Sequence, residues 1–588
     1  MRKIEWKLDD LWPVTEFDKR FAQVEGEIAN INKWWERLNG EMEIKEFREF
    51  LEWSEVLEEK MAILGSRPGL MEAVNVNDRE AKVMKSKITE LALKMADESR
   101  KIEHWLKGLS VEGKESLSET QAKRLFGAIK DLEYGLWHGR RAAKHTLAQR
   151  EEMIIDYKDT YGIGPLNELR EMITTELKFE MKIGGETKII ENQSELLKYT
   201  HSPDPQEREA SYRALLTKYG DNMDKLFVIY QGVVKDWGFE ARLRGYKSPI
   251  SVRNFANDIP DGVVSTLLDV TRKNRDIFWR YFKFKAKVLG MKKLKRWDVY
   301  APLTSKQDTY SWEEAVDLTL GAFGEFSKGF KQKAELILKN EHVDVYPGEA
   351  KSSGAFCATI SPKITPYVML NFTGQTRDVS TLAHELGHGV HSLFAQNHYP
   401  SSQHSALPLA ETASTLGEMM LFEKLFEKAD AETKRAMLSD KIADSYATIL
   451  RQNYFVRFEI EAHELISKGI KPDELSKVYL NNLREQFGEA VETDESFANE
   501  WLYVSHFFET PFYCYAYNFG ELLSLALYQE YKEKGKIMSD KIERILTFGG
   551  SEDPFVILKE ADIDVTQESF WQKGFEVLRG WQEMMERL

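Results

Sequence analysis

Apolar residues recur every three or four positions along most of the chain, with charged residues between them. This spacing predicts amphipathic helices, and it is clearest in residues 16–38 and 78–109. Segments that contain glycine or proline at residues 65–78, 161–167 and 183–188 are expected to interrupt the helices. The first two hundred residues are therefore interpreted as one helix after another.

A different pattern occupies residues 345–375, where short runs of β-branched and aromatic residues stand between glycine, proline and serine. The runs at 354–360 and 367–373 predict two antiparallel strands joined by a proline-containing connection. Helical periodicity resumes near residue 378 and continues to the C-terminus. The expected fold is mainly α with a small antiparallel β-sheet.

The 588 residues exceed what one hydrophobic core normally serves, so at least two packed units are expected. A helix-start signal at residues 200–209, with serine or aspartate before proline, favours a boundary just before it. We therefore expect a helical N-terminal region at 1–199, which forms part of one lobe, and a catalytic region at 200–588, which carries the chemistry described below.

The formal net charge of −15 argues against nucleic-acid binding, which depends on contacts from Lys and Arg to phosphate. The basic stretch at 283–296 is expected to be a solvated surface of helix and loop. Cys357 and Cys514 are the only cysteines, which suits a reducing compartment, and each is expected to be a small buried side chain. No apolar run is long enough to span a membrane and no leader-like stretch is visible, so a cytoplasmic protein is expected. Nothing in the sequence indicates an oligomeric state.

The segment DVSTLAHELGHGVHSLF, at 378–394, carries the most specific chemistry in the sequence. His384 and His388 are four residues apart, so a helix places both imidazoles on one face, within reach of one metal ion. Glu385 lies beside them, where it can take a proton from a metal-activated water. His463 also precedes a glutamate but lacks the second histidine, and we expect that segment to be a surface helix.

A catalytic zinc ion takes three protein ligands and keeps one position open. The first carboxylate after His388 is Glu411, at the start of the next periodic helix, which is the layout of the gluzincin class of metallopeptidases. Glu418 follows on the same helix and is a candidate supporting carboxylate. The alternative for Glu411 is an ordinary charge at a helix N-terminus.

Other histidines near the motif have simpler expected roles. His391 lies about 10 Å along the helix axis from His384, so it is expected to be a supporting polar group rather than a third ligand. Position 394 is Phe, where the metzincin pattern requires a histidine. His398 and His404 are expected to be ordinary loop histidines.

Two glycines, Gly387 and Gly389, lie inside the predicted helix beside the motif histidines. Each costs about 1 kcal/mol relative to Ala in a helix interior. Their positions predict the close approach of another backbone, of substrate or of a packed helix.

A second cluster occupies the segment HFFETPFYCYAYNFGE, at 506–521. Tyr513 and Tyr517 are four residues apart and would share a helical face, and His506 precedes them. A phenol or imidazole near a metal can donate a hydrogen bond to the oxyanion of amide hydrolysis. An aromatic core is the alternative role for this cluster.

Together these motifs resemble the oligoendopeptidase F branch of the thimet oligopeptidase family of zinc metallopeptidases. The matching segments follow one order over nearly the whole chain: EWKLDDLWP, KAKVLGMKKLKRWDVYAPL, SGAFCATI, PYVMLNFTG, DVSTLAHELGHGVHS, LAETAST, HFFETPFYCYAYNFGE and LTFGGSEDPF. The resemblance implies two mostly helical lobes that enclose a deep substrate channel, with the small sheet beside the active site.

The resemblance also implies roles for individual residues. It implies that the ligands of one zinc ion per chain are His384, His388 and Glu411. The general base is Glu385. The residues that stabilise the oxyanion or orient substrate are His506, Tyr517 and Tyr513. Tyr513 matches the family across a one-residue gap, so which tyrosine contacts the oxyanion stays open.

These observations predict a zinc-dependent metalloendopeptidase that hydrolyses internal bonds of short oligopeptides. An extended peptide is expected to pair with the edge strand near Gly354, Ala355 and Phe356. Backbone pairing reads little side-chain identity, so many peptide sequences are expected as substrates. The alternatives are a carboxypeptidase-like zinc hydrolase and a helical peptide-binding protein that keeps a metal site without catalysis.

Overall fold

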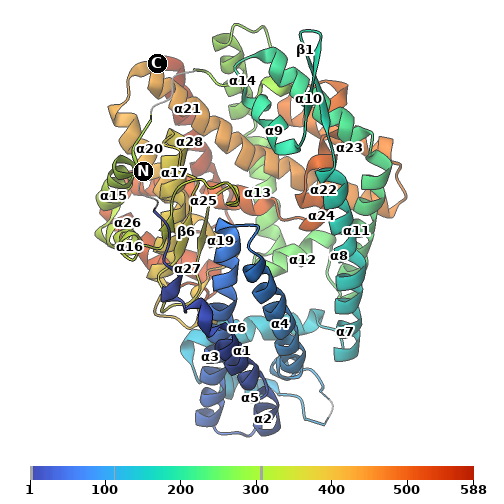
Figure 1. Ribbon diagram of the computed structural model, residues 1–588, viewed down its shortest axis with the longest axis vertical. Helices are drawn as coiled ribbons and strands as arrows, with labels where there is room; N and C mark the ends of the chain where they lie inside the picture. The colour runs from blue at the N-terminus through green and yellow to red at the C-terminus, as the bar shows by residue number, and fades with distance from the viewer. Residues whose placement is uncertain (1–3, 112, 305–308) are drawn as a thin grey trace. The chain divides into compact units, whose positions relative to one another are not determined.

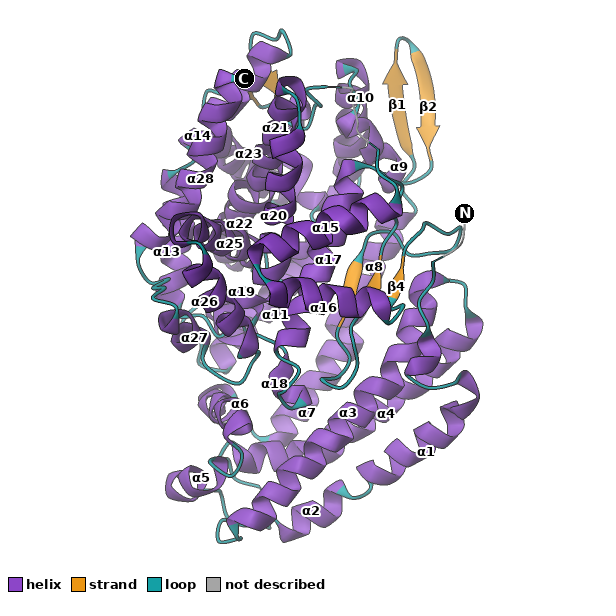
Figure 2. Cartoon of the chain, turned by 90° about the vertical axis from the view of Figure 1, so that its left-hand side faces the viewer, coloured by secondary structure: helices purple, strands orange, loops and turns teal. Residues whose placement is uncertain are grey.

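The computed structural model describes residues 4–111, 113–304 and 309–588, and the chain is mainly helical with small sheets, as the pattern predicted (Figure 1, Figure 2). It divides into two compact units. Unit 1 comprises Met1–Glu151, Gln307–Glu427 and Glu530–Asp564, and unit 2 comprises Glu152–Lys306, Lys428–Gln529 and Val565–Leu588. Each unit is built from three separate segments of the chain, so neither unit corresponds to the residues before or after position 200. The expected functional division at that position stays a prediction.

The helices of unit 1 are α1 (Phe17–Ile28), α2 (Ile31–Arg37), α3 (Ile44–Val74), α4 (Arg79–Leu106), α5 (Glu119–Phe126), α6 (Lys130–Arg141), α15 (Trp312–Phe326), α16 (Lys328–Lys339), α17 (Thr376–Phe394), α18 (Pro400–Gln403), α19 (Leu407–Ala410), α26 (Lys536–Thr547) and α27 (Pro554–Glu560). Those of unit 2 are α8 (Gly164–Thr175), α9 (Gln193–Lys198), α10 (Pro205–Gly220), α11 (Met223–Leu243), α12 (Pro249–Ala256), α13 (Asp261–Lys273), α14 (Asp276–Val288), α21 (Ala431–Ser445), α22 (Gln452–Ser467), α23 (Pro472–Phe487), α24 (His506–Glu509) and α28 (Glu568–Arg587). Residues of both units belong to α7 (Gln149–Lys158), α20 (Thr412–Lys428) and α25 (Tyr515–Lys534). Among the helices of the described ranges, none combines the length and apolar character that a membrane crossing needs.

Short 3-10 and π segments connect many of these helices. The 3-10 segments are η1 (Leu8–Asp10), η2 (Val14–Glu16), η3 (Ala142–His145), η5 (Tyr199–His201), η6 (Arg296–Asp298) and η8 (Glu495–Tyr503). The π segments are η4 (Asp159–Ile163) and η7 (Tyr446–Arg451).

The predicted strand pair lies in unit 1 as β5 (Phe356–Ala358) and β6 (Tyr367–Met369), which pair antiparallel. A third strand, β4 (Val343–Asp344), pairs parallel with β6. The sheet is therefore mixed rather than purely antiparallel, and its order β4-β6-β5 leaves β5 at an edge. In unit 2, β3 (Leu294–Lys295) pairs parallel with β7 (Val491–Glu492).

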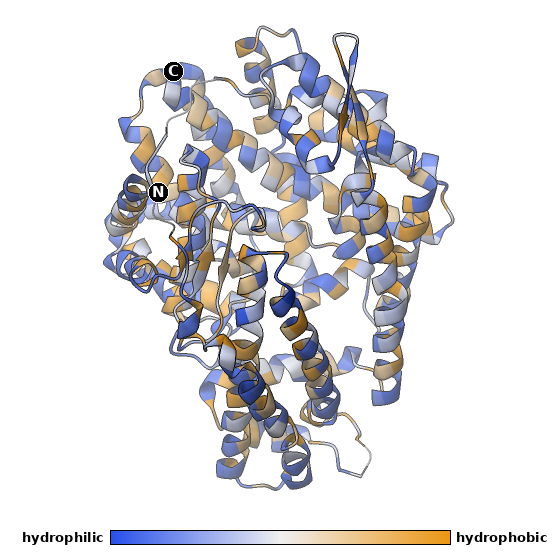
Figure 3. Cartoon of the chain, in the orientation of Figure 1, coloured by the Kyte–Doolittle hydropathy of each residue, from blue (hydrophilic) through white to orange (hydrophobic). Residues whose placement is uncertain are grey.

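The core of unit 1 joins its first helices to this sheet. Buried side chains of α1, α3, α4 and α6 form one apolar cluster with Ile360, Tyr367 and Met369. Trp6 contacts the rings of Phe356 and Tyr367 at centroid distances of 6.1 and 5.9 Å. Hydrophobic and hydrophilic residues alternate along these helices, as amphipathic packing requires (Figure 3). The N-terminal helices therefore support the sheet.

The break expected at 65–78 is much shorter in the structure. Helix α3 continues through Pro68 to Val74, because the buried side chain of Pro68 packs in the core of unit 1. This packing outweighs the cost of the missing backbone hydrogen bond. The chain turns only before Asp78, whose carboxylate caps α4 by accepting the Ala81 amide at 3.0 Å.

Two other expected breaks have different structures. Residues 161–167 do not break the helix, since η4 continues directly into α8. At 183–188 the helices are interrupted as predicted, by a hairpin of β1 (Phe179–Ile183) and β2 (Glu186–Ile190), so the first two hundred residues are not one helix after another throughout. Gly184 and Gly185 connect its strands with φ of +57° and +89°, the left-handed pair that a tight type I′ turn requires.

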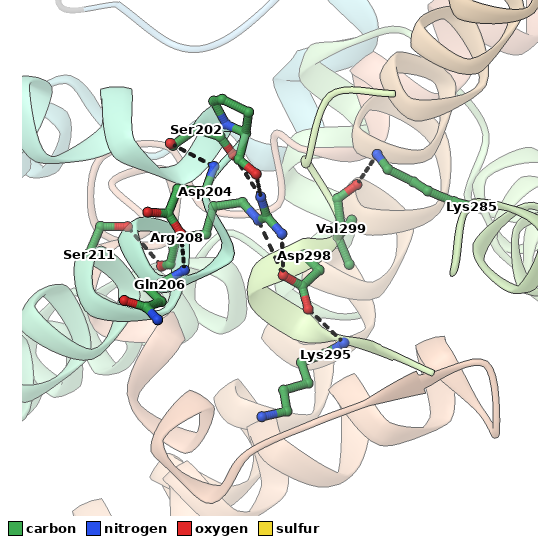
Figure 4. A network of polar contacts seen from close by, with 10 residues as sticks. Ser202, Asp204, Gln206, Arg208, Ser211, Lys285, Lys295, Asp298 and Val299 are labelled. Carbon is green, nitrogen blue, oxygen red and sulfur yellow. Dashed lines mark hydrogen bonds and ion pairs between the residues drawn. The ribbon is translucent and has the colours of Figure 1, made fainter. Parts of the chain in front are cut away.

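The interior of unit 2 contains an ion pair between Arg208 of α10 and Asp298 of η6 (Figure 4). Arg208 Nη2 lies 2.7 Å from Asp298 Oδ1, and both side chains are buried. Arg208 also donates to the carbonyl oxygens of Ser202 and Pro203 at 2.7 and 3.0 Å. These contacts fix the start of α10 against η6.

The basic stretch at 283–296 is not uniformly solvated. Lys285 is buried and donates to the Val299 carbonyl oxygen at 2.8 Å (Figure 4). Arg296 is fully buried and pairs with Glu500 at 2.5 Å. The expectation of a surface segment was wrong for these two residues, because one face of α14 and the 3-10 segment η6 pack into unit 2.

We predict that Arg208→Met lowers the free energy of unfolding by about 3–5 kcal/mol, because it leaves the Asp298 carboxylate buried without its partner. Urea unfolding followed by tryptophan fluorescence measures the change. Arg213→Met on the same helix is the control, since Arg213 is half exposed and pairs with Glu209 at the surface. Its loss should stay within about 1 kcal/mol, and equal losses in both variants would contradict the prediction.

Candidate metal centre

His384 and His388 lie one turn apart on α17, as their spacing predicted. Their Nε2 atoms are 3.1 Å apart, and their rings are nearly perpendicular, at 83°. Both side chains are about one quarter exposed, at 28% and 25%. The two nitrogen lone pairs therefore converge at a position that solvent can reach.

A close contact between α17 and α20 brings the third candidate ligand to this pair. A Cβ atom on Gly387 would lie 2.5 Å from Ser414 Cα and 2.6 Å from the Ala413 carbonyl oxygen. Only glycine permits this approach, so the prediction of a close backbone beside the motif is confirmed at Gly387. Gly389 instead faces side chains, with Ile337 Cδ1 2.4 Å and Cys357 Sγ 3.6 Å from the position of its Cβ.

Glu411 stands at the junction of α19 and α20, and its carboxylate meets the two histidines. Glu411 Oε2 lies 3.4 Å from His384 Nε2 and 3.4 Å from His388 Nε2. Ser414 Oγ donates to the same oxygen at 2.9 Å and holds it in place. Glu411 is thus not an isolated helix charge.

The three atoms fit a tetrahedral cation. A tetrahedral zinc ion with ligand bonds of about 2.0–2.1 Å separates its ligand atoms by roughly 3.3–3.4 Å. The observed edges of 3.1, 3.4 and 3.4 Å match that triangle. His384, His388 and Glu411 therefore form a group that could hold a metal ion.

Glu418 supports this group as a second carboxylate on α20. Its Oε1 lies 2.6 Å from His384 Nδ1, on the side of the ring away from the other donors. Burial lowers the pKa of His384, but the hydrogen bond to Glu418 and the charges of Glu418, Glu411 and Glu385 raise it to about 9. A carboxylate at Nδ1 also orients the ring and makes Nε2 a better ligand.

Glu385 follows His384 on α17 and is buried, with 7% of its surface exposed. Burial raises its pKa, while the nearby imidazoles of His384 and His388 lower it. A carboxyl group with a raised pKa beside a metal site can both accept and release a proton. Burial of its thiol and the charge of Glu385 raise the pKa of Cys357, but the residue is only partly buried, whereas a buried side chain was expected.

His391 is a supporting polar group, as its distance from the motif predicted. Burial lowers its pKa to about 4, and its imidazole forms a hydrogen bond with the backbone of Ala410. Ala410 immediately precedes Glu411. The neutral imidazole therefore ties α17 to the turn that carries the third candidate ligand.

The predicted edge strand lies beside α17 in the same unit. Thr359 and Ser392, at the ends of β5 and α17, are joined by a hydrogen bond between their hydroxyl groups. Gly354 adopts a φ of +87°, and its carbonyl oxygen accepts from Asn371 Nδ2 at 2.7 Å. The residues from Gly354 to Phe356 thus lead into β5 along a defined path.

The histidine and tyrosine residues of the second cluster gather in unit 2. His506 Nε2 lies 3.1 Å from the Tyr517 hydroxyl oxygen, and the Tyr513 ring lies 5.2 Å from the Tyr517 ring. Burial lowers the pKa of His506, which favours its neutral form. The structure brings these three residues together, as the spacing predicted, while the candidate metal ligands belong to unit 1.

His463 is not on a surface helix, as was expected. Its side chain is buried in unit 2, and burial lowers its pKa to about 3. The face of α22 that carries His463 also buries Glu459 four residues earlier. The expectation was wrong because Glu464 lies on the exposed face of α22, while the opposite face of this helix is apolar and buried.

Sequence reasoning missed the carboxylates that hold the connection between α17 and α18. Asp131 pairs with His398 and accepts the Tyr399 amide at 2.8 Å. Glu55 accepts the Ser401 amide at 3.1 Å and its hydroxyl at 2.6 Å. The partners are more than 250 positions apart, so no local pattern signals them. His398 is therefore not an ordinary loop histidine.

A second group of carboxylates, Asp159, Asp236 and Glu240, is also compact enough to hold a cation. Lys158 Nζ already lies among them, 2.8 Å from Asp159 and 3.4 Å from Glu240, and it also pairs with Asp236. The ammonium group neutralises these acids, so we do not interpret them as a metal site.

The helical fold and the group of two histidines and a glutamate on neighbouring helices are typical of HExxH metallopeptidases. The chain matches the sequence model of peptidase family M3 over residues 198–577. It is 30% identical over 454 residues to an oligoendopeptidase F homolog of Borreliella burgdorferi, and the alignment covers 75% of each chain. It is 25% identical over 575 residues to oligopeptidase PepF of Bacillus subtilis, covering 95% of this chain and 83% of that protein.

The fold agrees with these matches. The crystal structure of oligoendopeptidase-F from Enterococcus faecium superposes with a TM-score of 0.72 at 20% identity, covering 97% of this chain and 98% of the other. The chain therefore belongs to peptidase family M3, a family of metallopeptidases. The resemblance inferred from the motifs is confirmed.

We predict that Glu418→Ala weakens metal binding roughly ten- to a hundredfold, because His384 loses the carboxylate that orients it. Competition with a fluorescent chelator measures the affinity. Glu427→Ala, an exposed position on the same helix, should leave the affinity unchanged. Equal affinities of the Glu418 variant and the unmodified protein would contradict the role assigned to Glu418.

The Asp131–His398 pair predicts a pH-dependent contribution to stability. Burial raises the pKa of Asp131, but the hydrogen bond from His398 outweighs burial and lowers this pKa below 3.8. The same hydrogen bond is the main reason that the pKa of His398 is raised above 6.5. The histidine's contribution is complete below pH 6.5 and is lost as the pH rises through its raised pKa. The aspartate's contribution is complete above pH 3.8 and is lost as the pH falls through its lowered pKa.

Asp131→Asn should therefore destabilise the protein most between pH 3.8 and 6.5, and less as the pH rises further. Unfolding midpoints of the variant and the unmodified protein, measured across this range, provide the check. A difference that does not change with pH would show that the charges of the pair do not contribute.

Proposed function

We propose that this M3 peptidase is a zinc-dependent metalloendopeptidase that cleaves internal bonds of short oligopeptides, with one zinc ion per chain. The observation that carries the proposal is the triangle of donor atoms from His384, His388 and Glu411, with edges of 3.1, 3.4 and 3.4 Å, beside the buried Glu385. Relatives named oligoendopeptidase F support an action on internal bonds of oligopeptides. The two unpaired cysteines are compatible with the cytoplasmic location that we infer.

Bound zinc would polarise the scissile carbonyl group and lower the pKa of a water molecule. The carboxylate of Glu385 accepts a proton from the attacking water and passes it to the nitrogen of the leaving amine. Burial raises the pKa of Glu385 above its ordinary value, which makes its carboxylate a stronger base for this proton. Glu418 keeps the imidazole of His384 in the orientation that presents Nε2.

We propose that Tyr517 donates a hydrogen bond to the oxyanion, and that His506 is the hydrogen-bond partner of Tyr517. The 3.1 Å contact between His506 Nε2 and the Tyr517 hydroxyl lets the neutral imidazole donate its Nε2 proton to the phenol oxygen, so that the phenol proton can point to the oxyanion. Tyr513 packs on both rings and is proposed to orient substrate. These roles follow the family resemblance.

The substrate is proposed to be an extended peptide that pairs with the outer side of β5. This strand has β6 on one side and stands at the edge of its sheet. Main-chain hydrogen bonds near Gly354, Ala355 and Phe356 would bind peptides with little regard to their side chains.

The test is Glu385→Gln, assayed on internally quenched peptides that are blocked at both ends. The variant should bind zinc as the unmodified protein does but lose at least about a thousandfold in kcat, because an amide cannot take the proton. A metal analysis accompanies each assay, and Glu464→Gln at an exposed site serves as the control. Retained turnover in the Glu385 variant would refute its assignment as the base.

The same assay separates the alternative functions. A carboxypeptidase-like enzyme would leave the doubly blocked peptides intact. A non-catalytic peptide-binding protein would bind them without turnover, before and after removal of zinc by a chelator. Cleavage that disappears on chelation and returns with added zinc is the outcome that the proposed function requires.

A further inference from the structure

The turn between α24 and α25 determines how the histidine and tyrosine residues of unit 2 meet. His506 begins α24, Tyr513 lies in the turn, and Tyr517 lies in the first helical turn of α25. The contact between His506 Nε2 and the Tyr517 hydroxyl thus spans the turn. The path of residues 510–515 therefore helps to set the distance between these two side chains.

The turn contains a strained residue. Phe512 has a φ of +59°, in the left-handed region that bulky side chains rarely adopt. Its side chain is buried, and its ring lies 4.5 Å from the ring of His463. Such a conformation persists only where surrounding contacts hold it.

The contact at the backbone of this residue comes from Glu459 of α22. Glu459 Oε1 accepts the Phe512 amide hydrogen at 2.8 Å. Glu459 is fully buried, and its helix neighbours Phe455, Phe458 and Ala462 are buried apolar residues. A carboxyl group in such surroundings is costly, and the hydrogen bond that Oε1 accepts from the turn offsets part of that cost.

Burial raises the pKa of Glu459 to about 8, although the Phe512 amide and the charge of Arg253 lower it. The group is therefore mostly protonated at neutral pH, and glutamine is a close structural substitute for it. Two further bonds hold the flanks of the turn. Arg253 Nε donates to the Pro511 carbonyl oxygen at 3.2 Å, and Asn257 donates to the Tyr515 hydroxyl at 2.8 Å.

We propose that Glu459 is a positioning residue for the peptidase reaction, because its bond to the Phe512 amide fixes the strained turn that sets the His506–Tyr517 contact. The kinetic part of this inference rests on the proposed function. The structural part does not, because the bond and the turn exist whether or not the cluster stabilises an oxyanion.

The structural part is tested by hydrogen–deuterium exchange at single-residue resolution. The Phe512 amide should be protected in the unmodified protein, and Glu459→Leu should speed exchange in residues 510–517 while leaving α17 unchanged. Glu464→Leu, an exposed glutamate on the same helix, is the matched control and should alter neither region. Rapid exchange of the Phe512 amide in the unmodified protein would overturn the proposal even if Glu459→Leu did not fold.

The kinetic part is tested on the zinc-loaded enzyme with the blocked peptides. Glu459→Leu should lower kcat roughly ten- to a hundredfold, the loss expected from a small misplacement of a reacting group, with KM and zinc content nearly unchanged. Glu459→Gln keeps the acceptor oxygen and should retain kcat within about threefold. An undiminished kcat in Glu459→Leu, or an equal loss in Glu459→Gln, would overturn the role of this bond.

A double-variant cycle separates positioning from a general loss of stability. If Glu459 acts through Tyr517, the combination of Glu459→Leu with Tyr517→Phe should be no slower than Tyr517→Phe alone, within roughly twofold. Multiplicative losses would overturn the proposal. An inactive unmodified enzyme would refute the proposed function instead, and the exchange experiment would still decide whether Glu459 holds the turn.

Discussion

The candidate metal centre depends on one steric constraint, the backbone contact between α17 and α20 at Gly387. Any side chain at this position would collide with Ser414 Cα, 2.5 Å from the position of a Cβ atom. Without that contact the helices would separate, and Glu411 would leave the two imidazoles. The other contacts refine this arrangement: Glu418 orients one ring, and His391 holds the backbone just before Glu411. The site is therefore a product of helix packing, with hydrogen bonds fixing its details.

The two clusters of candidate functional residues lie in different units, and each cluster is supported by contacts within its own unit. In unit 1 the supports are carboxylates and a buried histidine around the candidate ligands. In unit 2 they are a buried acid and a strained turn next to the tyrosines. In both places polar groups are buried, although apolar side chains would cost less free energy to bury. Such burial is typical of sites where geometry matters more than stability.

Much of the fold and the site followed from local pattern. Helical periodicity, the pair of strands and the HExxH spacing are properties of neighbouring residues, and the structure contains them all. The errors arose where distant packing decides the outcome. Pro68 stays inside a helix because its side chain is buried, and His463 is buried because the rest of α22 is apolar. The two-residue strand β4 and the pairing of Asp131 with His398 have no local signature, since each partner lies far away in the chain.

The N-terminal helices also limit how the chain can be divided. The M3 match begins at residue 198, yet Asp131 and Glu55 hold the connection after α17, and Trp6 covers the sheet that supports β5. A polypeptide cut back to the matched segment would expose that apolar surface and leave the connection untethered. The early helices are thus an integral support of unit 1, and exchanging them between homologues would require transplanting their contact surface as well.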